Sequence, residues 1–397
     1  MIRQDYKIFS RGKIGTLALK NRLVRSATCE YQFGPNGEVN KTVLDIYRNL
    51  ALGGVGMIIT GLMAISEDAK GVPEQACIYD DVHMEQIKKI ADEVHETDAE
   101  TVVIAQLCHP GRQVTHENPN IGCVAPSTVN SPLLTRQARE LTINEIEIIV
   151  NNFVQAIIRV KKANFDGVQL HAAHGYLLSS FLSPYTNKRH DKYGGSTRKR
   201  VTIIGEIVSK AREFVGDYPI LIKLNCQDHV ESGISRINFP ELLSEVELSG
   251  VNGVEVSGGV WDSLTRTEEE LGFVPVPIPE SRTEIDDPNR QSYYYDDITD
   301  IDKKLPLILV GGHRNIESME ELMLSGKVDF LSLSRPLISE PELPNRWLNG
   351  RGSSNAKCLS CNACLVFKEQ FGCELKRGLK RRIFQEEMKK SWRNSFK

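Results

Sequence analysis

Short apolar segments alternate with longer amphipathic segments along most of the chain. Eight of the apolar segments are four to eight residues long, rich in aliphatic and β-branched residues, and apolar on both faces. Parallel strands that are covered by helices have this pattern. The predicted strands are residues 23–28, 55–61, 101–107, 166–171, 219–225, 251–257, 305–311 and 330–333.

The segments between these strands have the spacing of amphipathic helices. In residues 142–163, Thr142 and Glu145 are spaced as in a capping box, and apolar residues recur every three or four positions after them. Similar patterns cover residues 42–52, 82–97, 198–214, 239–249 and 315–325.

Eight strands that alternate with helices predict an α/β fold of the (β/α)₈ TIM-barrel type. No Gly-x-Gly-x-x-Gly motif follows any of the strands, which argues against an open dinucleotide-binding sheet. We expect residues 1–350 to form the barrel and residues 351–397 to form a C-terminal extension. Active-site residues should then follow the C-terminal ends of the strands.

Charge and composition exclude several classes of protein. The net charge of −3 and the pI near 6.3 argue against a nucleic-acid partner, and the basic residues 376–397 have the composition of a solvated tail. The longest apolar run, residues 53–65, is too short for a membrane span, and no N-terminal targeting signal is visible. Nine cysteines, five of them scattered singly, are typical of a reducing compartment, so we expect a cytoplasmic protein without a membrane partner.

Two histidines and a tyrosine follow the fourth predicted strand. His171 ends that strand, and His174 lies one tight turn later, so both imidazoles should face the barrel mouth. Two neutral N–H donors that converge on one carbonyl oxygen would stabilise the charge of an enolate. Tyr176 would supply an O–H that can protonate carbon. The spacing alone also fits a metal-binding pair or a structural pair in a buried loop.

The surrounding residues resemble a known family. Residues 167–200 read GVQLHAAHGYLLSSFLSPYTNKRHDKYGGSTRKR, which is similar to the old yellow enzyme family of flavin oxidoreductases. Further similar runs are LKNRLVRSAT (19–28), GGVGMIITG (53–61), IAQLCHPGRQ (104–113), VAPS (124–127), VEVSGG (254–259), ILVGGHR (308–314) and SRPLI (334–338). The resemblance covers about residues 5–350 and implies a noncovalent FMN across the barrel mouth.

The resemblance also implies which residues surround the flavin ring. They are Ser26, Ala27, Thr28, Cys29, Gly61, Gln106 and Lys223. Lys223 stands where the family usually has arginine, beside N1 and the C2 carbonyl, and its cation would favour the anionic reduced flavin without the planar fork of arginine. Cys29 and Tyr31 resemble a pair in the thermophilic-like branch that touches flavin and substrate, although Cys29 is equally compatible with an inert buried thiol.

A phosphate grip is implied at the ends of strands seven and eight, where barrels commonly bind phosphate. Its residues are Gly311, Gly312, Ser334 and Arg335. Backbone N–H groups and the arginine cation would hold the dianion. The family usually has glycine before this arginine, so Ser334 fits only if its φ is negative. Taken alone, a glycine pair is also typical of a tight turn.

Four cysteines form a second cluster near the C-terminus. Cys358, Cys361 and Cys364 have Cys-x-x-Cys-x-x-Cys spacing, and Cys373 follows. This spacing is compact enough for a metal ion or an iron–sulfur centre. The run resembles one that holds a [4Fe–4S] cluster in larger relatives such as dienoyl-CoA reductase and trimethylamine dehydrogenase, in which the fourth cysteine comes later. A [4Fe–4S] cluster, a zinc ion and free thiols remain alternatives.

Together these features predict an FMN-dependent ene-reductase. NADH or NADPH would reduce the flavin, and an α,β-unsaturated carbonyl substrate would then accept hydride at its β-carbon with its oxygen between His171 and His174. The main alternative is an amine dehydrogenase or demethylase that passes electrons through the cysteine cluster to a partner protein. A cofactor-free phosphate-binding barrel is a further alternative. We also expect a homo-oligomer, with residues 261–300 over the substrate pocket.

Overall fold

Eight parallel strands close into a barrel in the computed structural model, which describes residues 3–114, 122–134, 136–276, 278–285, 287–366 and 371–373. Each strand pairs with its neighbours in chain order, and β13 returns to pair with β3, which also pairs with β4. The barrel strands are β3 (Leu23–Arg25), β4 (Met57–Ala64), β6 (Val102–Cys108), β9 (Gly167–Ala172), β10 (Ile220–Gln227), β11 (Gly253–Gly258), β12 (Leu307–Val310) and β13 (Phe330–Leu333). The predicted (β/α)₈ fold is confirmed.

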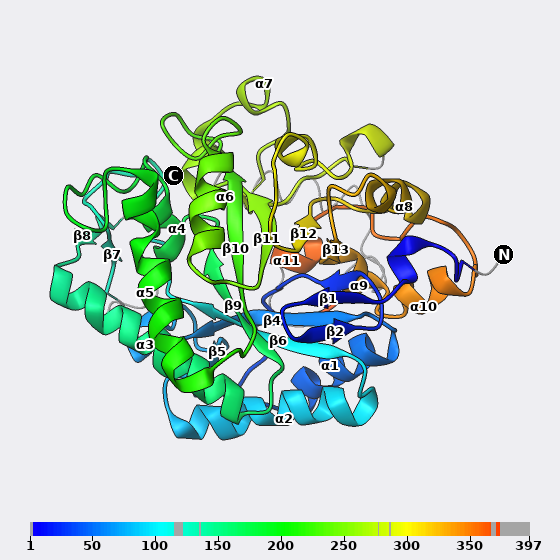
Figure 1. Ribbon diagram of the computed structural model, residues 1–397. Coiled ribbons are helices and arrows are strands. Elements are labelled where there is room, and N and C mark those ends of the chain that lie inside the picture. The colour runs from blue at the N-terminus through cyan, green and yellow to red at the C-terminus, as the bar shows by residue number, and fades with distance from the viewer. Residues whose placement is uncertain are drawn as a thin grey trace.

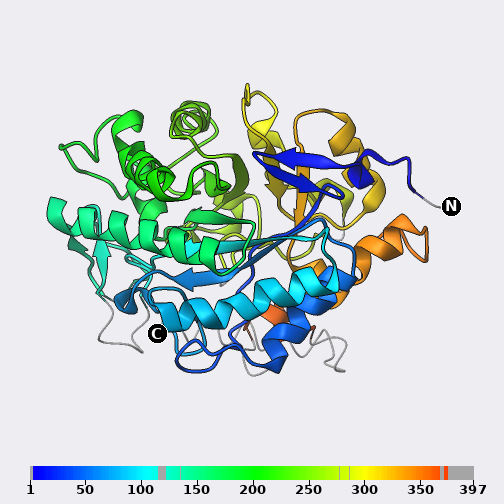
Figure 2. The same ribbon diagram turned by 60° about the horizontal axis from the view of Figure 1, so that its bottom comes forward.

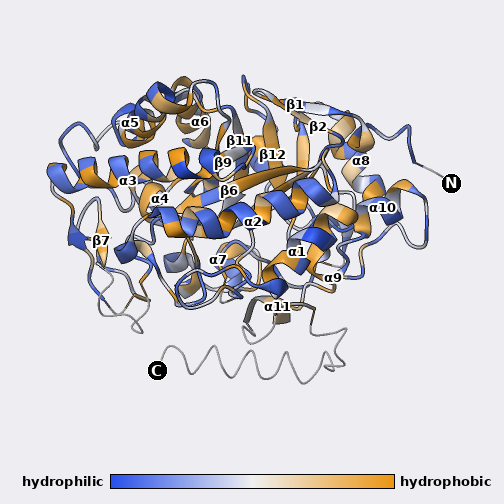
Figure 3. Cartoon of the chain, turned by 90° about the horizontal axis from the view of Figure 1, so that it is seen from below, coloured by the Kyte–Doolittle hydropathy of each residue, from blue (hydrophilic) through white to orange (hydrophobic). Residues whose placement is uncertain are grey.

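Amphipathic helices surround the strands (Figure 1). The longer ones are α1 (Lys41–Leu52), α2 (Asp81–Thr97), α3 (Ile143–Lys162), α5 (Thr197–Val215), α6 (Phe239–Leu248) and α8 (Ile316–Leu324). Helix α3 begins with the predicted capping box, because the Thr142 side chain accepts from the Glu145 N–H and Glu145 accepts from the Thr142 N–H. Figure 3 shows the interior strands as mostly hydrophobic and the outer helices with alternating hydrophobic and hydrophilic stripes.

A hairpin that the sequence pattern did not predict covers one end of the barrel. Strands β1 (Gly12–Ile14) and β2 (Leu17–Leu19) pair antiparallel and lie across the barrel in Figures 1 and 2. Ile14, Leu17 and Leu19 join a buried cluster with the first residues of several strands, among them Met57 and Phe330. Because this hairpin covers the N-terminal ends of the strands, the C-terminal ends are left to form a pocket.

Shorter elements occupy the loops. They are β5 (Ala76–Cys77), β7 (Val124–Ala125), β8 (Arg139–Glu140), α4 (Leu177–Leu182), α7 (Glu268–Leu271), α9 (Arg335–Ser339), α10 (Leu343–Leu348), α11 (Ala363–Val366) and the 3₁₀ turns η1 (Lys7–Phe9), η2 (Glu67–Ala69), η3 (Trp261–Thr265), η4 (Pro288–Arg290) and η5 (Asp296–Ile298). Within the described ranges, no helix has the length and apolar character that crossing a bilayer requires. The basic tail, residues 376–397, lies outside the described residues.

Candidate active site

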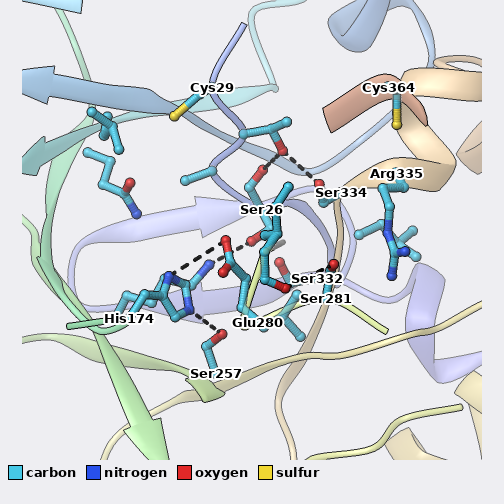
Figure 4. Close-up of a pocket in the computed structure, with 18 of the residues that line it drawn as sticks. Ser26, Cys29, His174, Ser257, Glu280, Ser281, Ser332, Ser334, Arg335 and Cys364 are labelled. Carbon is cyan, nitrogen blue, oxygen red and sulfur yellow. Dashed lines mark hydrogen bonds and ion pairs between the residues drawn. The ribbon is translucent and has the colours of Figure 1, made fainter. Parts of the chain in front are cut away.

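A large pocket opens at the C-terminal ends of the barrel strands. The space between its lining residues, with the open mouth included, is about 1320 Å³. Most of the residues that the resemblance implied line its wall: Ser26, Ala27, Thr28, Cys29, Tyr31, Gln106, His171, His174, Tyr176, Lys223, Gly312, Ser334 and Arg335. Figure 4 shows His174 on one side of this space and Ser334, Arg335 and Cys364 on the other.

Strand β3 ends earlier than the apolar pattern predicted, and this brings its following residues into the pocket. The strand stops at Arg25, and the Ser26 N–H still donates to the carbonyl oxygen of Leu333 at 3.0 Å. Ser26, Ala27 and Thr28 therefore leave the sheet at its C-terminal edge. They line the pocket as a loop, in which backbone and side-chain groups are both available to a ligand.

The two histidines lie close together on this wall. Their ring centroids are 5.1 Å apart and their planes cross at 82°. His171 comes from β9, and its buried Nδ1 has no hydrogen-bond partner among the described residues. His174 has a left-handed backbone conformation with φ of 62°, and its N–H donates to Asn225 Oδ1 at 3.1 Å. That hydrogen bond stabilises a backbone conformation that non-glycine residues adopt rarely.

Both imidazoles are neutral at neutral pH. Burial, assisted by the nearby Lys223 cation, lowers the pKa of His171 to about 3. Burial, with the neighbouring His171 ring and the Lys223 cation, also lowers the pKa of His174 well below its usual value. His174 Nε2 lies 2.8 Å from Ser257 Oγ. If the serine hydroxyl donates to Nε2, the proton of His174 is on Nδ1, so a second neutral N–H donor faces the pocket.

Tyr176 lies beside this pair. Its ring centroid is 4.7 Å from that of His171, and burial raises its pKa well above the usual value, so its hydroxyl remains protonated. Sequence reasoning did not identify Glu280, whose Oε1 lies 3.9 Å from His174 Nδ1 (Figure 4). Burial raises the pKa of this carboxyl. The long loop between β11 and β12 carries Glu280, and nothing in its sequence distinguished this residue from its neighbours.

A buried ionic network lies beneath the pocket. Lys223 Nζ donates to Ser26 Oγ at 3.0 Å and lies 3.5 Å from Glu255 Oε2. Ser26 and Ser332 each donate to Glu255 Oε1 at 2.7 Å. Burial raises the pKa of Glu255, but Lys223 and the hydrogen bonds outweigh burial, and the net pKa lies below the usual value. Glu255 is therefore ionised, and it fixes the position of the Lys223 cation.

The network extends through Gln169 on β9 to Gln106 on the adjacent strand β6. Gln169 Nε2 donates to Glu255 Oε2 at 2.9 Å, and Gln106 Nε2 donates to Gln169 Oε1 at 2.7 Å. The hydrogen bond from Nε2 fixes the orientation of the Gln106 amide, and the amide oxygen remains available to accept a hydrogen bond from a ligand. Glu255 was not predicted, although a single charged residue inside an apolar parallel strand is a signal that could have identified it.

The other end of the pocket carries two buried arginines. Ser334 has φ of −107°, which meets the condition for serine at this position. Arg335 Nη1 donates to the carbonyl oxygen of Arg282 at 2.7 Å and to Asn362 Oδ1. Arg314, a pocket residue that the sequence argument did not select, donates to the carbonyl oxygen of His313 at 2.7 Å and to Ser360 Oγ at 3.0 Å.

The implied glycines do not all reach the pocket. Gly312 lines it with φ of 78°, and a Cβ there would lie 2.7 Å from the ring of Tyr293. Gly311, with φ of 134°, packs against the neighbouring tyrosine rings outside the lining. Gly61 lies behind the pocket, where a Cβ would approach Glu30 Oε2 to 2.4 Å. Its lack of a side chain therefore makes room for Glu30.

Cys29 and Tyr31 lie together at the pocket wall. Burial, with a smaller contribution from Glu30, raises the pKa of Cys29 to about 11, so the thiol is protonated at neutral pH. Tyr31 has φ of 50°, and the Cys29 side chain, together with burial, raises its pKa. A protonated thiol is compatible with either expectation for Cys29, contact with the flavin or an inert buried group.

The four C-terminal cysteines gather around a second, smaller cavity. This space of about 300 Å³, open solvent included, is lined by Cys358, Cys361, Cys364 and Cys373, and none of the four forms a disulfide. Burial and the other three cysteines raise the pKa of Cys364 to about 12. Arg335 and Cys364 line both cavities, so the two spaces share a wall. Among the described residues, no group of three or more His, Cys, Asp or Glu side chains is arranged to hold a metal ion.

Comparisons with known proteins agree with this geometry. The profile of the NADH:flavin oxidoreductase / NADH oxidase family matches residues 7–353. An NADH oxidase of Thermoanaerobacter brockii is 36% identical over 358 residues, which cover 89% of this chain and 52% of that protein. An NADPH dehydrogenase of Clostridium acetobutylicum is 30% identical over 341 residues, which cover 84% of this chain and 92% of that protein.

One solved structure extends the similarity to the C-terminal part of the chain. A complex of 2-naphthoyl-CoA reductase with 2-naphthoyl-CoA superposes with a TM-score of 0.82 at 25% identity, and covers 96% of this chain and 58% of that chain. The chain spans about half the length of the NADH oxidase.

Proposed function

Because the chain belongs to the NADH:flavin oxidoreductase / NADH oxidase family, we propose that it is an FMN-dependent enzyme that reduces α,β-unsaturated carbonyl compounds with NADH or NADPH. The observation that carries this proposal is the pair of neutral, buried histidines beside Tyr176 in the same pocket as a buried lysine. The cytoplasmic location, the homo-oligomeric state and the boundary near residue 350 stay predictions.

The pocket residues fit FMN at both ends. At one end, Lys223 would lie beside the pyrimidine ring, and the Gln106 oxygen would accept from its N–H. At the other end, Gly312 and Arg335 would hold the phosphate, and Ser26 to Cys29 would line the ring. The buried Nδ1 of His171 has no hydrogen-bond partner among the described residues, so it is available to a ligand of the pocket. When bound, FMN supplies hydride transfer between the nicotinamide and the substrate.

The residues of the chain would assist the reduction of an enone in two ways. His171 and His174 would donate their N–H groups to the carbonyl oxygen, where negative charge develops as the β-carbon gains hydride. Because both rings are neutral, they would stabilise this charge without transferring a proton to oxygen. Tyr176 would then donate its hydroxyl proton to the α-carbon, which completes the saturated product, and water would reprotonate the tyrosine.

Replacing His171 and His174 together with alanine tests the carbonyl clamp. Binding of phenolate ligands, which form charge-transfer complexes with oxidised flavin, should weaken by about 100-fold or more, because two hydrogen bonds to a charged oxygen are lost. Stopped-flow reduction of the flavin by NADH or NADPH should change little. Equal loss of both reactions would contradict the assigned roles. A protein that takes up no FMN would contradict the flavin proposal altogether.

The arrangement of the cysteines favours a second candidate cofactor and function. The four thiols of Cys358, Cys361, Cys364 and Cys373 line one cavity beside the flavin pocket, and together they could hold a [4Fe–4S] cluster. With the Glu280 carboxylate near the clamp, this supports an amine dehydrogenase or demethylase that passes electrons to a partner protein. Iron and sulfide analysis of anaerobically purified protein tests the cluster. Flavin bleaching by methylated amines without nicotinamide tests the amine reaction.

A further inference from the structure

We propose that Ser360 and Asn362 are positioning residues for the FMN phosphate, so that the C-terminal cysteine segment, residues 353–364, completes the flavin site of the barrel. The inference rests on the proposed binding of FMN and adds two residues that no other observation assigns to it. Both residues flank Cys361, and both are almost fully buried.

Among the described residues, no carboxylate accepts a hydrogen bond from either of the two arginines at this end of the pocket, and Arg314 also contacts the Cys358 side chain. All the oxygens that accept from them within the described chain are neutral: His313 O and Ser360 Oγ for Arg314, and Arg282 O and Asn362 Oδ1 for Arg335. Arg314 Nε is buried without a partner among these residues. Two buried cations side by side are unfavourable until an anion neutralises them. A phosphate dianion at the pocket wall that both share meets this requirement.

The cysteine segment holds each guanidinium by a hydrogen bond from outside the barrel. Ser360 Oγ accepts from Arg314 Nη2 at 3.0 Å, and Asn362 Oδ1 accepts from Arg335 Nη1. Asn362 is itself held, because its Nδ2 donates to Ser281 Oγ at 2.9 Å. In each arginine, one part of the guanidinium is therefore bound to the segment, and the remaining N–H groups are left for phosphate oxygens.

The backbone of the segment is adapted to this contact. Ser360 has φ of 56° and Asn362 has φ of 62°, so both adopt the left-handed conformation. Asparagine tolerates this conformation better than most residues, and serine adopts it where surrounding contacts hold it. Cys364 and Arg335 line both cavities, so the wall between the phosphate end and the four thiols is one layer of side chains. The segment is thus a structural part of the phosphate end.

The test compares FMN with riboflavin, which has the same ring and no phosphate. Dissociation constants of both flavins are measured by titration of the full-length, flavin-depleted protein for the wild type, Asn362→Ala and Ser360→Ala. Asn355→Ala is the matched control, because Asn355 lies in the same segment and pairs with Asn315 on the surface. We expect Asn362→Ala to weaken FMN binding by about tenfold or more, since one hydrogen bond to a charged group is lost. Riboflavin binding should change by less than about twofold.

A second variant keeps the shape of the side chain. Asn362→Asp retains an acceptor for Arg335, but its negative charge competes with the phosphate, so FMN binding should weaken and riboflavin binding should not. Equal weakening of both flavins, or no change for FMN, would overturn the positioning role. Wild-type protein that binds riboflavin and FMN equally well would also overturn it, and would leave the flavin function intact. Wild-type protein that binds neither flavin would overturn both proposals.

Discussion

Replacing Glu255 with glutamine removes the carboxylate that pairs with Lys223 at the base of the pocket. The two charged atoms are 3.5 Å apart, and both side chains are almost completely buried. Coulomb's law at this distance with an effective dielectric constant of about 20 gives an attraction of about 5 kcal/mol. Breaking one partner of a buried pair typically destabilises a protein by about 3–5 kcal/mol, because the other charge is left buried and unpaired. We therefore expect Glu255→Gln to lower the free energy of unfolding by about 3–5 kcal/mol.

A double-mutant cycle isolates this interaction. Lys223→Met and Glu255→Gln are measured singly and together by urea unfolding, followed by circular dichroism at saturating FMN and corrected for the affinity of each variant. The free energy of unfolding of the double variant should be higher, by about 3–5 kcal/mol, than the value obtained by adding the losses of the two single variants. The exposed Glu85→Gln is the control for the amide substitution. Additive losses within about 0.5 kcal/mol would refute the reasoning.

The same pair predicts a pH dependence. The pKa of Glu255 lies below the usual value in the folded protein. Its contribution to stability is therefore complete above the unfolded-state pKa of about 4.3 and is lost as the pH falls through the lower folded-state value. Glu255→Gln should lack this acid-dependent loss. A wild-type and a variant that lose stability in parallel below this pH would contradict the ionised state of Glu255.

Three further substitutions test other parts of the site. Burial raises the pKa of Glu30 to about 7. The stability that protonated Glu30 contributes is therefore lost as the pH rises from the unfolded-state pKa of about 4.3 through about 7. Glu30→Gln should lack this loss, and at pH about 8.5 its free energy of unfolding in urea should exceed that of the wild type by up to about 3 kcal/mol. Ser257→Ala frees His174 Nε2 and should weaken phenolate binding by about tenfold, measured by charge-transfer absorbance, with flavin affinity unchanged. Tyr176→Phe should slow the reduction of enones and spare quinones, which need no proton on carbon; equal slowing of both would remove Tyr176 as the donor.

Most strands and helices of the barrel could be predicted from the local pattern of apolar and polar residues. The predicted strand 330–333 and the observed β13 coincide, and the predicted helix 142–163 differs from α3 by one residue at each end. Buried parallel strands and amphipathic helices each require a repeating pattern of apolar side chains, so the pattern records them. The hairpin β1–β2 has no such repeating apolar pattern. Its apolar residues are buried only because they pack on the end of the barrel, which is formed by residues far away in the chain.

The sequence by itself determined the fold class, the position of His171, His174 and Tyr176 at the end of the fourth strand, and the resemblance that pointed to a flavin. Tertiary structure decided which distant residues meet: Glu255 under Lys223, Glu280 beside His174, and Ser360 and Asn362 on Arg314 and Arg335. The reason is physical. Backbone periodicity is set by neighbours in the chain, whereas an ion pair or a phosphate site is set by side chains that come together only when the barrel closes and its C-terminal segment folds back onto it.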